Sequence, residues 1–176
     1  MNNAEPFIRQ LGLADRDAYF LLRLRGLKAH PELFGQSYDE ALAKGPGQHD
    51  AMLEGAHAAE GSFLLGAYLS ADTLLIGVVG LARNPRERER HKASVIGMYV
   101  APEAAGRGVG RALLNELLTR AARVDGLRQL QLMVDSRNEA ARKLYASFGF
   151  RKYGCEVEGL NVDGVFHDTD LMMRWL

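Results

Sequence analysis

Three alternate glycines, Gly106, Gly108 and Gly110, stand directly before a helix-like segment, where they allow a ligand to approach the backbone closely. The first turn of a helix presents unpaired N–H groups and the positive end of the helix dipole, which together suit a phosphate or pyrophosphate. Arg107 and Arg111 add fixed positive charge at the same turn. The alternative is a tight connection in which the glycines only relieve strain. We favour a phosphate-binding turn.

The letters of this turn exclude two common phosphate-binding loops. A P-loop needs a Gly-Lys-Ser/Thr sequence, and none follows here. A dinucleotide-binding fingerprint that starts at Gly106 needs a glycine at position 111, which is Arg111. One that starts at Gly108 needs a glycine at position 113, which is Leu113.

No residue set predicts a metal site or a covalent nucleophile. The five histidines, at positions 30, 49, 57, 91 and 167, include no closely spaced His-x-x-x-His pair. The lone Cys155 has no activating histidine near it in sequence, which argues against a covalent intermediate. A single cysteine also cannot form an internal disulfide, and a reducing cytoplasm fits this usage best.

The composition is that of an ordinary globular domain. The chain has 176 residues, 47% of them hydrophobic and 25% charged, and we expect one domain over residues 1–176. Lys plus Arg and Asp plus Glu each number 22, and this balance argues against nucleic-acid or polybasic membrane binding. The longest apolar stretch, residues 74–82, is far below the roughly 20 residues of a membrane span. We expect no signal peptide at residues 1–5, which have no basic segment and no apolar run after them.

Helical periodicity predicts the segments that position the glycine turn. Residues 18–27 have helical spacing, and residues 36–60 are helical in part, with an interruption at Gly45-Pro46-Gly47. A later helix follows Ser136 and Asn138, both of which suit an N-cap. The helix after the glycine turn presents an apolar face made of Val109, Leu113, Leu114, Leu117 and Ala121.

Strand patterns alternate with these helices. Ser70-Ala71-Asp72 is short enough to join two strands as a hairpin, and Val162-Asp163-Gly164 suits a second hairpin turn near the C-terminus. This order predicts a mixed α/β fold around one sheet. The predicted strands are residues 63–69, 74–81, 94–100, 128–134, 150–160 and 165–175.

Two motifs give this chain a family resemblance. Residues 98–103 (Met-Tyr-Val-Ala-Pro-Glu) and 106–114 together resemble the coenzyme A motif of the GCN5-related N-acetyltransferases (GNAT). Residues 138–145, followed by Phe148-Gly149-Phe150, are similar to the second signature of that family. The resemblance covers nearly the whole chain. It implies one domain with a central, mostly antiparallel twisted sheet of six or seven strands, splayed between the fourth and fifth strands and flanked by about four helices.

The resemblance also implies a reaction, in which an acetyl group passes from acetyl-CoA to a primary amine by direct attack in a ternary complex. The strand at Met98, Tyr99 and Val100 would pair with the pantetheine arm, and its backbone N–H would stabilise the oxyanion. Asn138 would hydrogen-bond the pantetheine. Tyr145, which the pattern alone assigns to the core, would protonate the leaving thiolate. The pyrophosphate would be held by Gly106, Arg107, Gly108, Val109, Gly110 and Arg111.

Two positions depart from the family pattern. Ala105 stands where an Arg or Gln usually opens the coenzyme A motif, so cofactor affinity is in question. Family members that acetylate ribosomal-protein N-termini use a glutamate as general base, and the residue at the matching position here is Met133. This difference puts that substrate class in doubt. Two alternatives also stay open. One is a non-catalytic sensor or assembly module that binds coenzyme A or acyl-CoA, and the other is a different fold that uses the turn for another nucleotide.

The acceptor and the general base are less defined. Tyr38, Glu40, His167 and Asp168 are candidate substrate-binding residues. His91, Glu40, His167 and Asp168 are candidate bases, and a water relay is an alternative. Because members of the family often dimerise, the resemblance also implies a homodimer as an assembly to test. An acidic patch that attracts a cationic amine is a further hypothesis, and its members are Glu156, Glu158, Asp163, Asp168 and Asp170.

Overall fold

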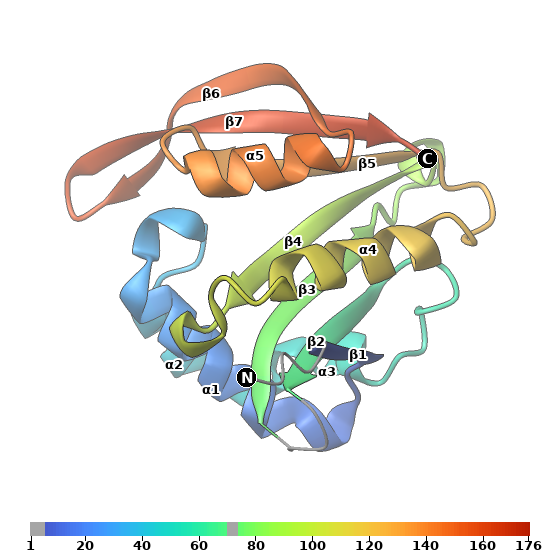
Figure 1. Cartoon of the computed structure of the whole chain (residues 1–176), viewed down its shortest axis with the longest axis horizontal. Helices are drawn as coiled ribbons and strands as arrows, with labels where there is room; N and C mark the ends of the chain where they lie inside the picture. Colours follow the sequence, from blue (N-terminus) through green and yellow to red (C-terminus); the bar gives the residue numbers. More distant parts are fainter. Residues whose placement is uncertain (1–5, 70–73) are drawn as a thin grey trace.

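A seven-stranded mixed sheet in the order β1-β2-β3-β4-β5-β7-β6 forms the centre of the protein (Figure 1), seen in a computed structural model that describes residues 6–69 and 74–176. All neighbouring strands pair antiparallel except β4 and β5, which pair parallel. The predicted fold class is therefore confirmed. The predicted turn at residues 70–72 and the first five residues lie outside the described part. The strands are β1 (Pro6–Gln10), β2 (Phe63–Leu69), β3 (Leu75–Arg83), β4 (Lys92–Val100), β5 (Gln129–Asp135), β6 (Arg151–Val162) and β7 (Val165–Trp175).

The described residues form five α-helices, one more than the roughly four expected, because a short helix follows the predicted interruption at Gly45-Pro46-Gly47. Helices α4 and α5 lie over one face of the sheet, and α1 packs on the other (Figure 1). No helix in the described ranges has the length and apolar character needed to cross a membrane. The helices are α1 (Arg16–Ala29), α2 (Tyr38–Lys44), α3 (Asp50–Leu53), α4 (Val109–Ala121) and α5 (Glu139–Ser147).

Strand alternation divides the core between the two faces. In β2, Phe63 and Leu65 pack on the α4 side, whereas Leu64 and Tyr68 pack on the α1 side. All five apolar residues predicted on the helix after the glycine turn are buried against the sheet. The helix stripe is therefore what holds the glycine turn at the end of β4.

The first strand is not indicated by the sequence pattern. β1 pairs with β2 at the edge of the sheet, and its residues lack a clean alternation of buried and exposed positions. Pro6 is tolerated there because an edge strand leaves some N–H positions unpaired. Pairing with β2, rather than local propensity, makes this segment a strand.

The splay between β4 and β5 creates the space for a site. The two strands pair only where Lys92, Ala93 and Ser94 face residues 129–131, and their pairing ends beyond these positions. A β-bulge strengthens the bend, because Gly97 (φ +58°) and its neighbour Met98 oppose one residue of β3. From Val95 onward, β4 therefore turns backbone groups toward β5 without a strand partner.

Candidate active site

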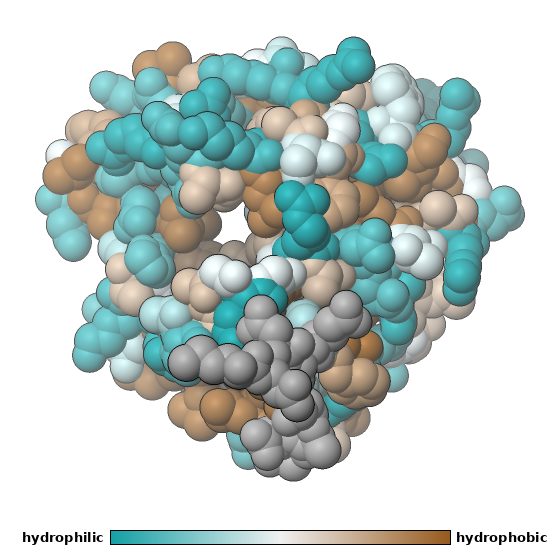
Figure 2. All heavy atoms as spheres, in the orientation of Figure 1, coloured by the Kyte–Doolittle hydropathy of each residue, from teal (hydrophilic) through white to brown (hydrophobic). Residues whose placement is uncertain are grey.

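A cavity of about 580 Å³ fills the splay between β4 and β5, and we call it the splay cavity. The glycine turn closes one end, and the start of α5 covers it. In Figure 2 an open hollow lies between α5 and the segment that follows α1, with hydrophobic residues around it. The lining includes Val95 to Val100 of β4, the turn residues Ala105, Gly106, Gly108, Val109, Gly110 and Arg111, and Met133, Asp135, Asn138, Ala141, Leu144 and Tyr145.

The glycine turn presents several free backbone donors. Gly106 (φ +73°) and Gly108 (φ +76°) are left-handed, a conformation that favours glycine. Within the described residues, the N–H groups at positions 106, 108, 109, 110 and 111 have no backbone acceptor. Arg107 and Arg111 are exposed, with no described carboxylate within ion-pair distance. The turn therefore fits a doubly charged anion such as a pyrophosphate.

Gly110 sets how closely α4 approaches β4. A Cβ at this position would lie 3.1 Å from Met98 Cε and 3.3 Å from Leu144 Cδ2. Because both neighbours line the splay cavity, a side chain here would push into the cavity. The third glycine of the motif is therefore a packing residue, unlike the two left-handed ones.

Tyr145 occupies the inner wall of the splay cavity. The side chain is 8% exposed, its ring meets Phe150 edge-on at 5.9 Å, and its O–H donates to Met98 Sδ at 3.4 Å. Burial raises the pKa of Tyr145 to about 12. The residue is thus both a core residue and a protonated O–H at the cavity wall, so the two interpretations of its helical face are compatible.

Asn138 serves as the N-cap of α5. Its side-chain oxygen accepts from Ala141 N–H at 3.1 Å, whereas Ser136 Oγ, the other predicted cap, donates to Asp170 instead. Asn138 also lines the splay cavity, so capping fixes its amide at the cavity wall.

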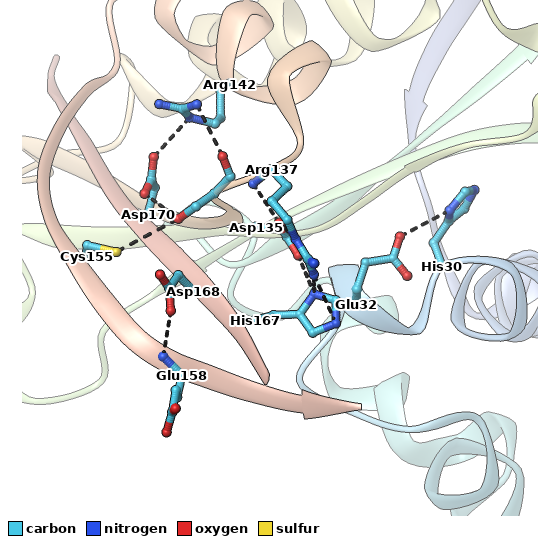
Figure 3. A network of polar contacts seen from close by, with 11 residues as sticks. His30, Glu32, Asp135, Arg137, Arg142, Cys155, Glu158, His167, Asp168 and Asp170 are labelled. Atoms are coloured by element: carbon cyan, nitrogen blue, oxygen red, sulfur yellow. Dashed lines mark hydrogen bonds and ion pairs between the residues drawn. The ribbon is translucent and has the colours of Figure 1, made fainter. Parts of the chain in front are cut away.

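A second, polar cavity of about 460 Å³ adjoins the first, and we call it the polar cavity. It shares His30, Leu33, Asp135 and Asn138 with the splay cavity, so the two cavities lie side by side. Figure 3 shows the imidazole of His167 beside Asp135 and Arg137, with Glu32 across from them. The full lining is His30, Glu32, Leu33, Asp135, Arg137, Asn138 and His167.

Asp170 anchors α5 to the sheet. It is 1% exposed and accepts from Ser136 Oγ at 2.6 Å, pairs with Lys152 Nζ at 2.7 Å and lies 2.9 Å from Arg142 Nε. Burial raises the pKa of its carboxyl, but the hydrogen bonds from Lys152 and Ser136 and the charges of Lys152 and Arg142 outweigh that effect, so the net pKa is lowered. The carboxylate is neutralised inside the protein, so Asp170 does not belong to the acidic surface patch hypothesised from the sequence.

Asp170→Asn is expected to destabilise the protein by about 1–3 kcal/mol at pH 7. This loss of stability is smaller than the usual cost of breaking a buried ion pair because Lys152 and Arg142 are partly exposed. Because the folded pKa is lowered, the stability from this group is present above the unfolded Asp pKa of about 3.9 and is lost as pH falls through the folded value. Urea unfolding should therefore show the difference between the variant and the parent shrinking toward roughly pH 2. The exposed Asp163→Asn is the control, and a constant difference across this range would contradict the role of Asp170.

The other predicted acceptor-site residues lie apart from the polar cavity. Tyr38 and Glu40 line a third cavity of about 740 Å³, between the start of α2 and the β6–β7 turn. There the Glu40 carboxylate accepts from Ser37 N–H in a capping box. Asp168 accepts from Glu158 N–H at 2.9 Å and points away from His167 (Figure 3). His91 is exposed just before β4 and lines neither the splay cavity nor the polar cavity.

Several cavity residues were missed by the sequence reasoning. His30 and Glu32 follow α1, far in sequence from the two motifs, and Arg137 lies between β5 and Asn138, where the sequence indicated only a helix cap. Asp135 alone carried a signal, since it is a carboxylate at the C-terminal end of a predicted strand. Met133, noted only as a departure, is 59% exposed and lines the splay cavity.

Comparisons with known proteins agree with this geometry. Residues 28–150 match the acetyltransferase (GNAT) family. The chain is 32% identical over 155 residues to mycothiol acetyltransferase of Acidothermus cellulolyticus, which covers 82% of this chain and 44% of that protein. A GNAT-family acetyltransferase structure from Streptococcus pneumoniae has a TM-score of 0.83 and 26% identity, over 98% of this chain and 100% of the other. The structure of yncA from Salmonella typhimurium with its cofactor acetyl-CoA has the same fold, with a TM-score of 0.78 and 21% identity over 98% and 94% of the two chains.

This chain belongs to the acetyltransferase (GNAT) family, because the match covers well over half of its residues. The resemblance stated from the two motifs is confirmed. The chain spans between 27% and 54% of the length of the curated relatives it matches.

Proposed function

We propose that this chain transfers an acetyl group from acetyl-CoA to a primary amine, by direct attack of the amine in a ternary complex. The single observation that carries the proposal is that the two cavities adjoin and share four lining residues. One has free N–H donors at its end and a buried phenol in its wall, and the other is lined by two carboxylates, two imidazoles and the Arg137 guanidinium. The first suits a long anionic cofactor, and the second suits a cationic acceptor.

The residues of the splay cavity fit the parts of acetyl-CoA. The free N–H groups of the glycine turn, with Arg107 and Arg111, would hold the pyrophosphate. The unpaired edge of β4 at Met98, Tyr99 and Val100 would bond the pantetheine amides, and Asn138 would add a side-chain bond. When bound, acetyl-CoA supplies a thioester carbonyl carbon as the electrophile.

Two groups of the protein act on charge during the transfer. Backbone N–H groups at the bulged part of β4 would stabilise negative charge on the carbonyl oxygen. The Tyr145 O–H lies in the same wall and would give its proton to the departing sulfur. A buried phenol with a raised pKa stays protonated at neutral pH, as a general acid must.

The first test is ligand-dependent melting. Saturating acetyl-CoA, at 100 times its Kd, is expected to add about 2.7 kcal/mol, or roughly 5–11 °C for a chain of this size. Coenzyme A should give a similar rise, and ATP and NAD should give none. Release of free thiol from acetyl-CoA is then followed with spermidine, with single amino acids and with a peptide that has a free N-terminus.

Each outcome separates the alternatives. Binding of acetyl-CoA with acetylation of an amine would support the enzyme. Binding without transfer to any amine would favour a coenzyme A-binding module instead. No melting shift with acetyl-CoA would contradict the proposal, and a shift with ATP or NAD would favour another nucleotide.

A further inference from the structure

We propose that His167 is the general base that deprotonates the acceptor amine, and that Asp135 positions its imidazole. The inference rests on the proposed acetyl transfer and names the group that makes the amine nucleophilic. An ammonium has no free electron pair, so it must lose a proton before its nitrogen can attack.

Strand pairing brings the two residues together although they are far apart in sequence. Asp135 ends β5 opposite Thr169 of β7, and His167 lies two residues before Thr169 on the same face of β7. His167 Nδ1 lies 2.7 Å from Asp135 Oδ2, and His167 is only 8% exposed. Both residues line the polar cavity, and Asp135 also lines the splay cavity.

The Asp135 carboxylate is itself held in place. Its Oδ1 accepts from Arg137 N–H at 2.7 Å, and its side chain is 3% exposed. Burial raises its pKa, but the hydrogen bonds from His167 and from the Arg137 backbone and side chain outweigh this, and the net pKa is lowered. An ionised Asp135 assigns the ring proton to Nδ1, because a carboxylate can only accept. Nε2 is then the ring nitrogen that can take a proton, and Asp135 stabilises the imidazolium that forms when it does.

The polar cavity already holds a cation against this pair. The Arg137 guanidinium contacts both ring nitrogens of His167, with Nη2 3.1 Å from Nε2, and its Nε lies 3.5 Å from Asp135 Oδ1. The Arg137 side chain is 63% exposed, so it is free to swing outward. An acceptor ammonium would take the place of the guanidinium, beside Nε2 of His167.

The charged and titratable groups that face His167 come from two sides. Asp135 and Arg137 lie at the end of β5, and His30 and Glu32 face them from the segment after α1 (Figure 3). Glu32 is directed to His30, at 3.5 Å, rather than to the His167–Asp135 pair. Of the other predicted bases, Asp168 is bonded to Glu158 N–H and Glu40 caps α2. His30 also has a carboxylate partner, but its 3.5 Å pair with Glu32 is partly exposed, whereas the 2.7 Å pair of His167 with Asp135 is buried.

The protons balance over one turnover. One N–H bond of the ammonium breaks, its proton joins His167 Nε2, and the electron pair remains on the nitrogen. A C–N bond then forms as the C–S bond breaks, and Tyr145 protonates the sulfur. After attack the nitrogen loses a second proton, which restores the Tyr145 phenol, and it keeps the third as the amide N–H. His167 releases its proton to solvent.

The test compares His167→Gln, His167→Ala and Asp135→Asn with the exposed control His57→Ala. Acetylation of the amine with the highest turnover is measured as kcat/KM against pH, and acetyl-CoA binding is measured by melting. Loss of the base is expected to lower kcat/KM about 10²–10⁴-fold while the melting shift with acetyl-CoA is retained. Added imidazole should partly restore His167→Ala. Hydroxylamine, which is mostly unprotonated at neutral pH, should be acetylated with a much smaller loss.

The results distinguish the inference from the proposal on which it rests. In the parent, kcat/KM should reach a plateau above its acid limb, whereas in His167→Gln it should rise steadily toward the pKa of the amine. A His167 variant with parental rate, or with a lowered rate but an unchanged pH profile, would overturn the role as base and leave acetyl transfer standing. A parent protein that acetylates no amine would overturn both.

Discussion

Tyr145→Phe is expected to lower turnover about 10²–10⁴-fold, the usual contribution of a positioned general acid. The substitution removes only the O–H, whose partner is the weak acceptor Met98 Sδ, and keeps the ring packed against Phe150. Stability and the melting shift with acetyl-CoA should therefore stay close to those of the parent protein. Thiol release at saturating acetyl-CoA, measured beside the melting shift, separates lost chemistry from lost binding.

The matched control is Tyr153→Phe, because Tyr153 is exposed on β6 and lines none of the described cavities. With the pKa of Tyr145 at about 12, the phenol keeps its proton as pH rises through the physiological range. Ionisation of Tyr145 should therefore cause no loss of turnover on the alkaline side of the pH profile, and the parent and Tyr145→Phe should have alkaline limbs of the same shape. Parental turnover in Tyr145→Phe would leave Tyr145 with its core role alone.

Gly108→Val is expected to weaken acetyl-CoA binding about 10- to 100-fold, from the loss of one hydrogen bond to a charged group at about 1.5–3 kcal/mol. Gly108 has a φ of +76° and precedes the first residue of α4. A β-branched residue is a strong outlier at positive φ, so the turn must change conformation and redirect its N–H groups. The measurement is the Kd for acetyl-CoA and for coenzyme A by calorimetry.

Gly45→Val is the control for backbone strain. Gly45 has a φ of +72° after α2 and, like Gly108, has open space where a Cβ would lie. Both variants should lose stability, at about 1–3 kcal/mol for a strained backbone position, but only the Gly108 variant should lose affinity for the cofactor. Equal affinity in Gly108→Val and the parent would mean that the turn is only a structural connection.

The departure at Ala105 has a structural context. Ala105 is exposed at the mouth of the splay cavity, in extended conformation just before Gly106. The free donors of the turn lie in the backbone beyond it, so an alanine here removes none of them. We therefore expect the missing Arg or Gln to affect affinity less than any change at Gly108.

Features that depend on neighbours along the chain could be predicted from the sequence. The glycine turn and the apolar stripe of α4 are such local features, because backbone conformation and helical spacing are set within a few residues. The choice of Asn138 over Ser136 as the N-cap of α5 is not local, because Ser136 donates to Asp170 of β7. Strand patterns also predicted six of the seven strands, whereas the splay between β4 and β5 was expected only from the family resemblance. The strand patterns did not predict β1, because β1 is a strand through its pairing with β2 rather than through its own sequence.

What the polar residues do depends on contacts between distant segments. Asp168 and Asp170 are two residues apart and therefore lie on the same face of β7, yet packing buries Asp170 against Lys152 and Arg142 and leaves Asp168 exposed. Asp135 and His167 meet only because β7 pairs beside β5, and His30 reaches the same cavity from the end of α1. Proton transfer needs groups a few ångströms apart, and such closeness between distant segments is set by sheet order and packing rather than by sequence spacing.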